Sequence, residues 1–146
     1  MVFCLFALSP CHAEGKKKKL TLTEQEFRAL RREMVEMDLN LRNLVSAMSM
    51  NFALETAGKF EQLESFQITQ MPNYKDAAIS LINKIKINNL INYFSDIHKE
   101  AEKARKMAKK THRNKTSANW KIIHESFSRI IESCRGCHDQ LEVEWK

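Results

Sequence analysis

Glycine and proline are scarce in this chain, which has three glycines and two prolines among its 146 residues. Between residues 16 and 135 the only glycine is Gly58 and the only proline is Pro72. A β-sandwich or barrel needs turn residues about every ten positions, so this scarcity argues against an all-β fold. Valine occurs only four times, which argues against a parallel sheet rich in β-branched strands. Because 43% of the residues are hydrophobic, a core is still available, and the remaining class is an all-α domain with few, long helices.

The first thirteen residues lack acidic and basic side chains apart from one histidine. Residues 1–8 are apolar, and the small residues Cys11 and Ala13 resemble a secretory cleavage site. We therefore expect residues 1–13 to be a signal peptide that is cut after Ala13, and the protein to be periplasmic. The stretch is too short to span a bilayer, so no membrane span is expected. A hydrophobic tail packed on the domain is the alternative interpretation.

A strong helix start follows this segment. Thr23 can cap the helix, Glu26 can complete a capping box, and Leu22 can pack on Phe27 as a hydrophobic staple. Apolar residues then recur in alternating steps of three and four, the pattern of a helix that buries one face. These residues are Phe27, Leu30, Met34, Met37, Leu41, Leu44 and Met48. We expect this helix to stop at Gly58.

The same periodicity predicts three further helices. They cover residues 59–70, 76–110 and 117–141. Pro72 ends the first of them, because the residue before a proline avoids helical angles. The first half of the long second helix, residues 79–91, is apolar almost all round, so it is either deeply buried or broken near Asn88-Asn89. Four amphipathic helices with short connections predict an antiparallel four-helix bundle over residues 23–146, preceded by a basic N-terminal segment, residues 14–22.

The last predicted helix carries the motif Cys-x-x-Cys-His at residues 134–138. Two thiols at this spacing can add to the two vinyl groups of one porphyrin edge, and the adjacent imidazole can then bind the iron. The other cysteines, Cys4 and Cys11, leave with the signal peptide, and export fits because c-type haem is attached outside the cytoplasm. We therefore predict one covalent haem c on Cys134 and Cys137, with His138 as the proximal iron ligand.

Three other chemistries use a cysteine pair of this kind. A thioredoxin-like redox pair needs a βαβ context, which the sequence does not predict. A zinc site needs four ligands, and His98, His112 or His124 would have to complete it without a recognisable spacing. A structural disulfide across two intervening residues is strained inside a helix. Each of these interpretations is weaker than haem attachment.

The motif on the last helix of an all-α chain resembles the class II cytochromes c, which include cytochrome c′ and the low-spin cytochrome c-556 type. Ordinary class I cytochromes c carry the motif near the N-terminus instead. The resemblance covers most of residues 24–146, including the segment 96–101. It implies a haem in the core of the bundle and a distal methionine early in the first helix. Met34 matches that position best, and Met37 is the alternative distal ligand.

These features predict a monohaem electron carrier rather than an enzyme. A high-spin, gas-binding haem protein and a haem subunit that docks on a larger redox enzyme are the alternatives. The net charge of +6 comes from residues 16–19 and from residues 99–115, which hold eight basic side chains. These charges favour an acidic redox protein as partner, and without a reader motif we expect no nucleic-acid binding. We expect both basic groups at the end of the bundle away from the motif. We also expect the protein to be a monomer or a homodimer.

Overall fold

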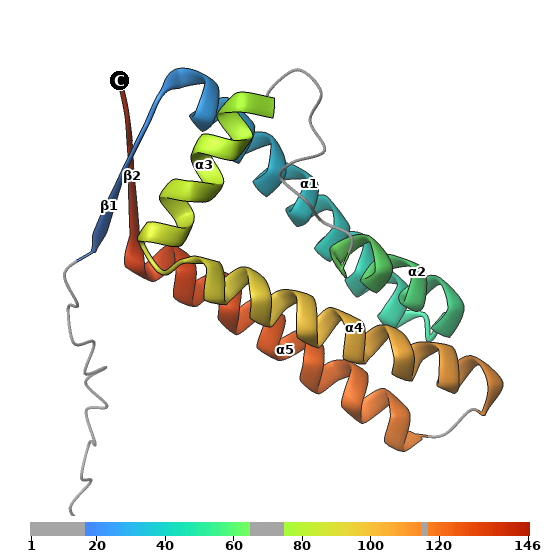
Figure 1. Ribbon diagram of the computed structural model, residues 1–146. Coiled ribbons are helices and arrows are strands. Elements are labelled where there is room, and N and C mark those ends of the chain that lie inside the picture. Colours follow the sequence, from blue (N-terminus) through green and yellow to red (C-terminus); the bar gives the residue numbers. More distant parts are fainter. Residues whose placement is uncertain (1–16, 65–74, 115–116) are drawn as a thin grey trace, which may run out of the picture.

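The computed structural model describes residues 17–64, 75–114 and 117–146. The chain is mostly helical, with five helices and a small two-stranded sheet in the described part (Figure 1). The elements are β1 (Lys18–Leu22), α1 (Glu24–Ser49), α2 (Ala53–Glu64), α3 (Lys75–Ile87), α4 (Ile91–Arg113), α5 (Ser117–Gln140) and β2 (Leu141–Trp145). The helical content agrees with the predicted all-α class, and the sheet was not predicted.

The start of α1 is the capping box that the sequence predicts. The Thr23 hydroxyl accepts a hydrogen bond from the backbone N–H of Glu26 (3.3 Å), and the Glu26 carboxylate accepts one from the backbone N–H of Thr23 (2.7 Å). Leu22 and Phe27 pack in the same apolar cluster, as a hydrophobic staple requires.

The end of α1 differs from the prediction. The helix stops at Ser49, and the predicted stop, Gly58, lies inside α2. Asn51 makes the turn instead, with φ of 57°, because its short amide side chain tolerates the left-handed conformation. The second helix therefore begins before residue 59. Its predicted end, residues 65–70 and Pro72, lies outside the described residues.

The long predicted helix is broken at the asparagine pair, so the broken alternative is confirmed. Asn89 has φ of 56°, and the backbone N–H of Leu90 donates to the carbonyl of Ile85 (3.0 Å), which closes the turn between α3 and α4. Beyond the break, the apolar face of α4 is buried. It consists of Leu90, Ile97, Ala101, Ala104 and Ala108, with Phe94 half-buried.

The sheet joins the two ends of the described chain. β1 pairs with β2 in parallel, from Lys18 opposite Leu141 to Leu22 opposite Trp145. Apolar and polar residues alternate along β1, so that Leu20 and Leu22 are buried while Lys19 forms an exposed ion pair with Glu144 (2.9 Å). The basic segment is therefore partly strand, and the last helix ends at Gln140 rather than at residue 141.

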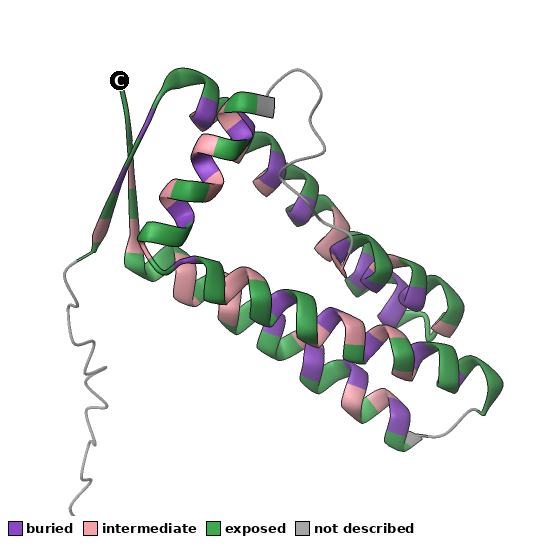
Figure 2. Ribbon diagram, viewed as in Figure 1, coloured by how far each residue is buried: buried purple, intermediate pink, exposed green. Residues whose placement is uncertain are grey.

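Each helix packs on at least one other helix of the described chain. α4 and α5 lie side by side as a helical hairpin, α2 packs on α4, and α1 packs on α2 and α3 (Figure 1). Buried residues face the interior along these helices (Figure 2). No helix in the described ranges is long and apolar enough to cross a membrane.

Two apolar clusters divide the core. The first holds Met37, Leu44, Met48, Ala57, Phe60, Leu63, Ile97, Ala101, Ala104, Ala108, Ile123 and Ile130. The second holds Leu20, Leu22, Ala29, Ala78, Leu81, Ile85 and Leu90. Cys134 packs against the first cluster and Cys137 against the second, so the motif lies where the two meet.

Candidate functional site

The motif residues line two adjoining hollows at the junction of the clusters. The larger has a volume of about 150 Å³ and is bounded by α1, α3, α4, α5 and the sheet. Its walls are Leu20, Leu30, Met34, Ile85, Leu90, Phe94, Cys137, His138, Leu141 and Val143. The smaller, of about 40 Å³, is lined by Met34, Met37, Tyr93, Phe94, Ile97, Cys134, Cys137 and His138. Because four residues line both, the hollows are two parts of one apolar space.

All five predicted site residues border this space. Cys134, Cys137 and His138 lie on one face at the end of α5, because residues three and four apart in a helix are neighbours. Met34 and Met37 reach the space from α1. The structure thus brings together two helices that are distant in the sequence.

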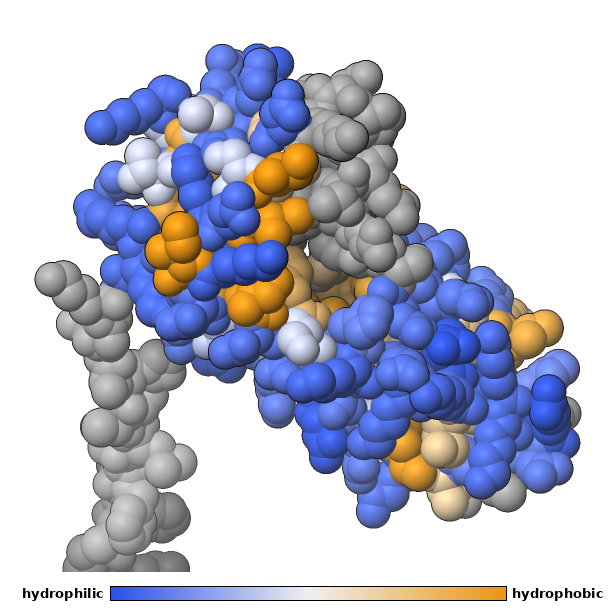
Figure 3. Space-filling view, in the orientation of Figure 1, coloured by the Kyte–Doolittle hydropathy of each residue, from blue (hydrophilic) through white to orange (hydrophobic). Residues whose placement is uncertain are grey.

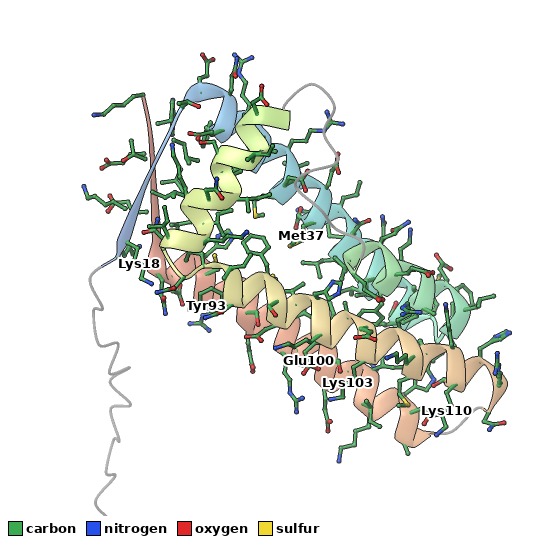
Figure 4. All side chains as sticks on the ribbon, in the orientation of Figure 1. Lys18, Met37, Tyr93, Glu100, Lys103 and Lys110 are labelled. Carbon is green, nitrogen blue, oxygen red and sulfur yellow. The ribbon has the colours of Figure 1, made fainter. Side chains whose placement is uncertain are left out.

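The two methionines have different surroundings. Met37 is 5% exposed and belongs to the first cluster, and its side chain extends from α1 toward α4 (Figure 4). Met34 is only half-buried, belongs to neither cluster, and lines both hollows together with His138. Met34 is therefore the more available thioether, and Met37 is mainly a core residue.

Both cysteines are free, half-buried thiols. Burial raises the pKa of the Cys134 thiol, and the neighbouring Cys137 raises it further. Burial likewise raises the pKa of Cys137. The thiols therefore stay protonated at neutral pH, whereas redox-active cysteine pairs have lowered pKa values. This environment disfavours the thioredoxin-like interpretation.

Gly136, inside the motif, allows α4 to approach α5 closely. A Cβ atom at this position would lie 2.9 Å from Cε1 of Tyr93. Tyr93 also lines the smaller hollow beside Cys134, so its ring packs directly on the turn of helix between the two cysteines. The glycine thus permits a contact that helps to hold the motif in place.

The other histidines take no part in this space. His98, His112 and His124 are exposed and line neither hollow, and the ring of His124 lies tilted beside Trp120 with centroids 6.0 Å apart. Across the residues that the structure describes, no three His, Cys, Asp or Glu side chains gather so that they could hold a metal ion. The zinc interpretation gains no support here.

The residues present fit a covalently bound haem in their chemistry. Two thiols one helical turn apart can form the covalent attachment, the adjacent imidazole can bind the iron, and a thioether from α1 is a second ligand of a kind that haem iron takes. The larger hollow is otherwise lined by aliphatic and aromatic side chains, which suit the apolar faces of a porphyrin.

The sheet contributes a wall that was not predicted. Leu20, Leu141 and Val143 close one side of the larger hollow. The signal was available, because apolar and polar residues alternate strictly over residues 19–22 and 141–144, the period of a half-buried strand. Five-residue segments at the two ends of a helical chain are easily taken for tails.

Comparisons with known proteins identify no relative: no family model, no curated protein and no solved structure matches this chain.

Proposed function

We propose that this chain is a periplasmic monohaem c-type cytochrome that carries single electrons, with its haem in the core of an antiparallel helical bundle. One observation carries the proposal: the Cys-x-x-Cys-His motif and Met34 converge on one apolar space. Export remains a prediction from residues 1–13, which lie outside the described residues. The resemblance to class II cytochromes c supports the same function.

Each residue has a definite task in this proposal. Haem iron, when bound, supplies one-electron redox chemistry. Cys134 and Cys137 would hold the group covalently through their sulfur atoms. His138 offers its imidazole nitrogen from α5, and Met34 offers its thioether from α1. The apolar walls exclude water, and a methionine ligand would raise the reduction potential relative to ligation by two histidines.

The apolar lining also favours one alternative. In a gas-binding protein like cytochrome c′, the sixth position stays open in an apolar pocket, and Met34 would only line it. The third possibility, a haem subunit docked on a larger redox enzyme, concerns the partner rather than the site. In each case we expect an acidic redox partner and a monomer or homodimer.

The test is a visible spectrum of the purified protein, oxidised and reduced, followed by acid and organic-solvent extraction. We expect haem bands that stay with the polypeptide. C134A and C137A should each remove one thioether and leave a poorly matured, unstable protein, and H138A should lose the proximal bond. The matched control is H124A, because His124 is also an exposed histidine on α5. Haem that partitions into the solvent, or an intact spectrum in H138A, would disprove the proposal.

A further inference from the structure

The basic start of β1 lies at the motif end of the molecule. Lys18 lies opposite Leu141 in the sheet, and Leu141 directly follows α5. The Nζ of Lys18 donates a hydrogen bond to the backbone carbonyl of Asn88 (2.8 Å). Lys18 therefore lies beside the turn between α3 and α4, whereas Lys110 lies at the opposite end of α4 (Figure 4). The expectation that the basic residues before the first helix lie away from the motif is wrong for Lys18 and Lys19, because the sheet places β1 beside the end of α5.

Three lysines near the motif are unpaired, although their neighbours Lys19 and Lys84 form ion pairs with Glu144 and Glu26. Lys17, Lys18 and Lys86 form no ion pair with a carboxylate of the described residues. By contrast, all five basic side chains between residues 99 and 109 are paired, whereas Lys110 and Arg113 form no ion pair within the described part of the chain. The pairs are Lys99–Asp96, Lys103–Glu100, Arg105–Glu64, Lys106–Glu102 and Lys109–Glu61. Much of the positive charge along α4 is therefore neutralised within the molecule, and Lys110 and Arg113 are left unpaired in its last turn.

Two isoleucines stand out from the surface beside these lysines. Ile87 is 80% exposed and Ile91 is 38% exposed, while Leu90 between them is buried and lines the larger hollow. Apolar side chains also gather over α3 in the space-filling view (Figure 3). Exposed apolar groups with a polar rim are typical of protein interaction sites. His138 is exposed as well, so the hollow reaches the surface at this end.

We propose that an acidic electron-transfer protein docks on the turn surface, which consists of Lys17, Lys18, Lys86, Ile87 and Ile91. This inference rests on the proposed function and specifies its partner. The partner has carboxylates around an apolar centre, so that its acids face the lysines and its centre covers the isoleucines. Docking here brings the partner against Leu90, which forms part of the wall of the larger hollow.

The charge pattern favours a protein over an anionic lipid surface. β2 places Glu142 and Glu144 beside the lysines, and Glu144 is already paired with Lys19. A uniformly anionic membrane would repel these carboxylates. A protein surface can complement both signs, because its charges are individually placed.

The test measures reduction of the haem-loaded protein by a reduced plant-type ferredoxin, a small acidic redox protein, in a stopped-flow experiment. K86E should lower the second-order rate about fivefold at low salt, and the difference should shrink at high ionic strength. K110E is the matched control, because Lys110 is exposed and also lies in the last turn of its helix. I87S should slow the reaction too, whereas L39S, at an exposed leucine of α1, should not.

Carbodiimide cross-linking to the same ferredoxin separates docking from the proposed function, because it needs no redox step. Cross-links at Lys17, Lys18 or Lys86 support the turn surface. Cross-links confined to residues 99–115, or an equal loss of rate in K86E and K110E, overturn it. Binding to phosphatidylglycerol vesicles that requires Lys86, without a ferredoxin effect, overturns it in favour of a membrane. A protein without haem bands refutes the proposed function, and the cross-links still decide the docking.

Discussion

Met34 and Met37 lie one turn apart on α1, but their surroundings give them different roles. Met37 fills the first cluster, and Met34 faces the space that His138 borders. We expect M34A to lose the weak absorption at the red end of the oxidised spectrum that marks methionine–iron bonding. M37A should keep this band and lose about 2–5 kcal/mol of unfolding free energy, the usual cost of truncating a buried methionine.

Each of these two variants is the control for the other, because both remove a thioether from the same helix. Thermal or urea unfolding measures the stability, and the red absorption measures the ligand. Loss of the band in M37A alone would show that Met37 is the iron ligand and that Met34 is not. An unchanged band in both variants would exclude methionine ligation from α1 and favour the gas-binding alternative.

Gly136 offers a second test at the scale of single residues. A methyl group added there meets the Tyr93 ring at 2.9 Å, so G136A should destabilise the protein by about 1–3 kcal/mol through overpacking. The double variant G136A/Y93L should recover part of that loss, because the shorter side chain leaves room for the new methyl. Chemical denaturation of the four members of this cycle checks the coupling, and strictly additive losses would show that Tyr93 is not the obstacle.

At the scale of elements, Glu26 of α1 connects this helix to α3 through side-chain hydrogen bonds. Its carboxylate is 2% exposed and accepts hydrogen bonds from Ser80 Oγ (2.6 Å) and Lys84 Nζ (2.7 Å), as well as from the backbone of Thr23. Burial alone would raise the pKa of Glu26, but the hydrogen bonds from Lys84, Ser80 and Thr23 and the charge of Lys84 outweigh burial and lower it to about 2. The same residue therefore caps one helix and holds another.

This shift makes the stability depend on pH in a defined window. The lowered pKa means that Glu26 contributes fully above its ordinary value of 4.5, and that the contribution disappears as the pH falls to about 2. We expect E26Q to cost up to about 3 kcal/mol at neutral pH, and the difference from the wild type to shrink below pH 4.5. Urea unfolding between pH 2 and pH 7 measures it.

E24Q is the control for this experiment. Glu24 lies in the same first turn of α1, but its ion pair with Arg28 is largely exposed, so little change is expected at any pH. A difference between E26Q and wild type that stays constant down to pH 2 would contradict the role given to the ionised carboxylate.

At the scale of the whole molecule, the sheet closes one side of the apolar space with strands from both ends of the described chain. Ending the chain at Gln140 removes β2, exposes Leu20 and Leu22, and opens the wall that Leu141 and Val143 form. We expect a loss of about 2–4 kcal/mol from the newly exposed leucines. The visible spectrum should also respond, because water gains access to the space beside His138.

Removal of Lys146 alone is the control for the truncation. It costs the single backbone hydrogen bond that the Lys146 N–H donates to the carbonyl of Leu22, and it leaves the register of the sheet intact. Equal thermal stability and equal spectra in the two shortened chains would mean that β2 is not part of the site.

The sequence by itself determined the helical class, the capping box at Thr23 and Glu26, the buried face of α4 and the two thiols with their histidine on one helix face. These are local properties, set by periodicity, capping chemistry and residue spacing. Tertiary structure decided where α1 ends, because Asn51 rather than Gly58 makes the turn. It also decided the pairing of β1 with β2, because a strand of five residues gains its stability from a distant partner. The same long-range pairing placed Lys18 beside the motif, and packing of the two clusters separated Met34 from Met37 within one turn of α1.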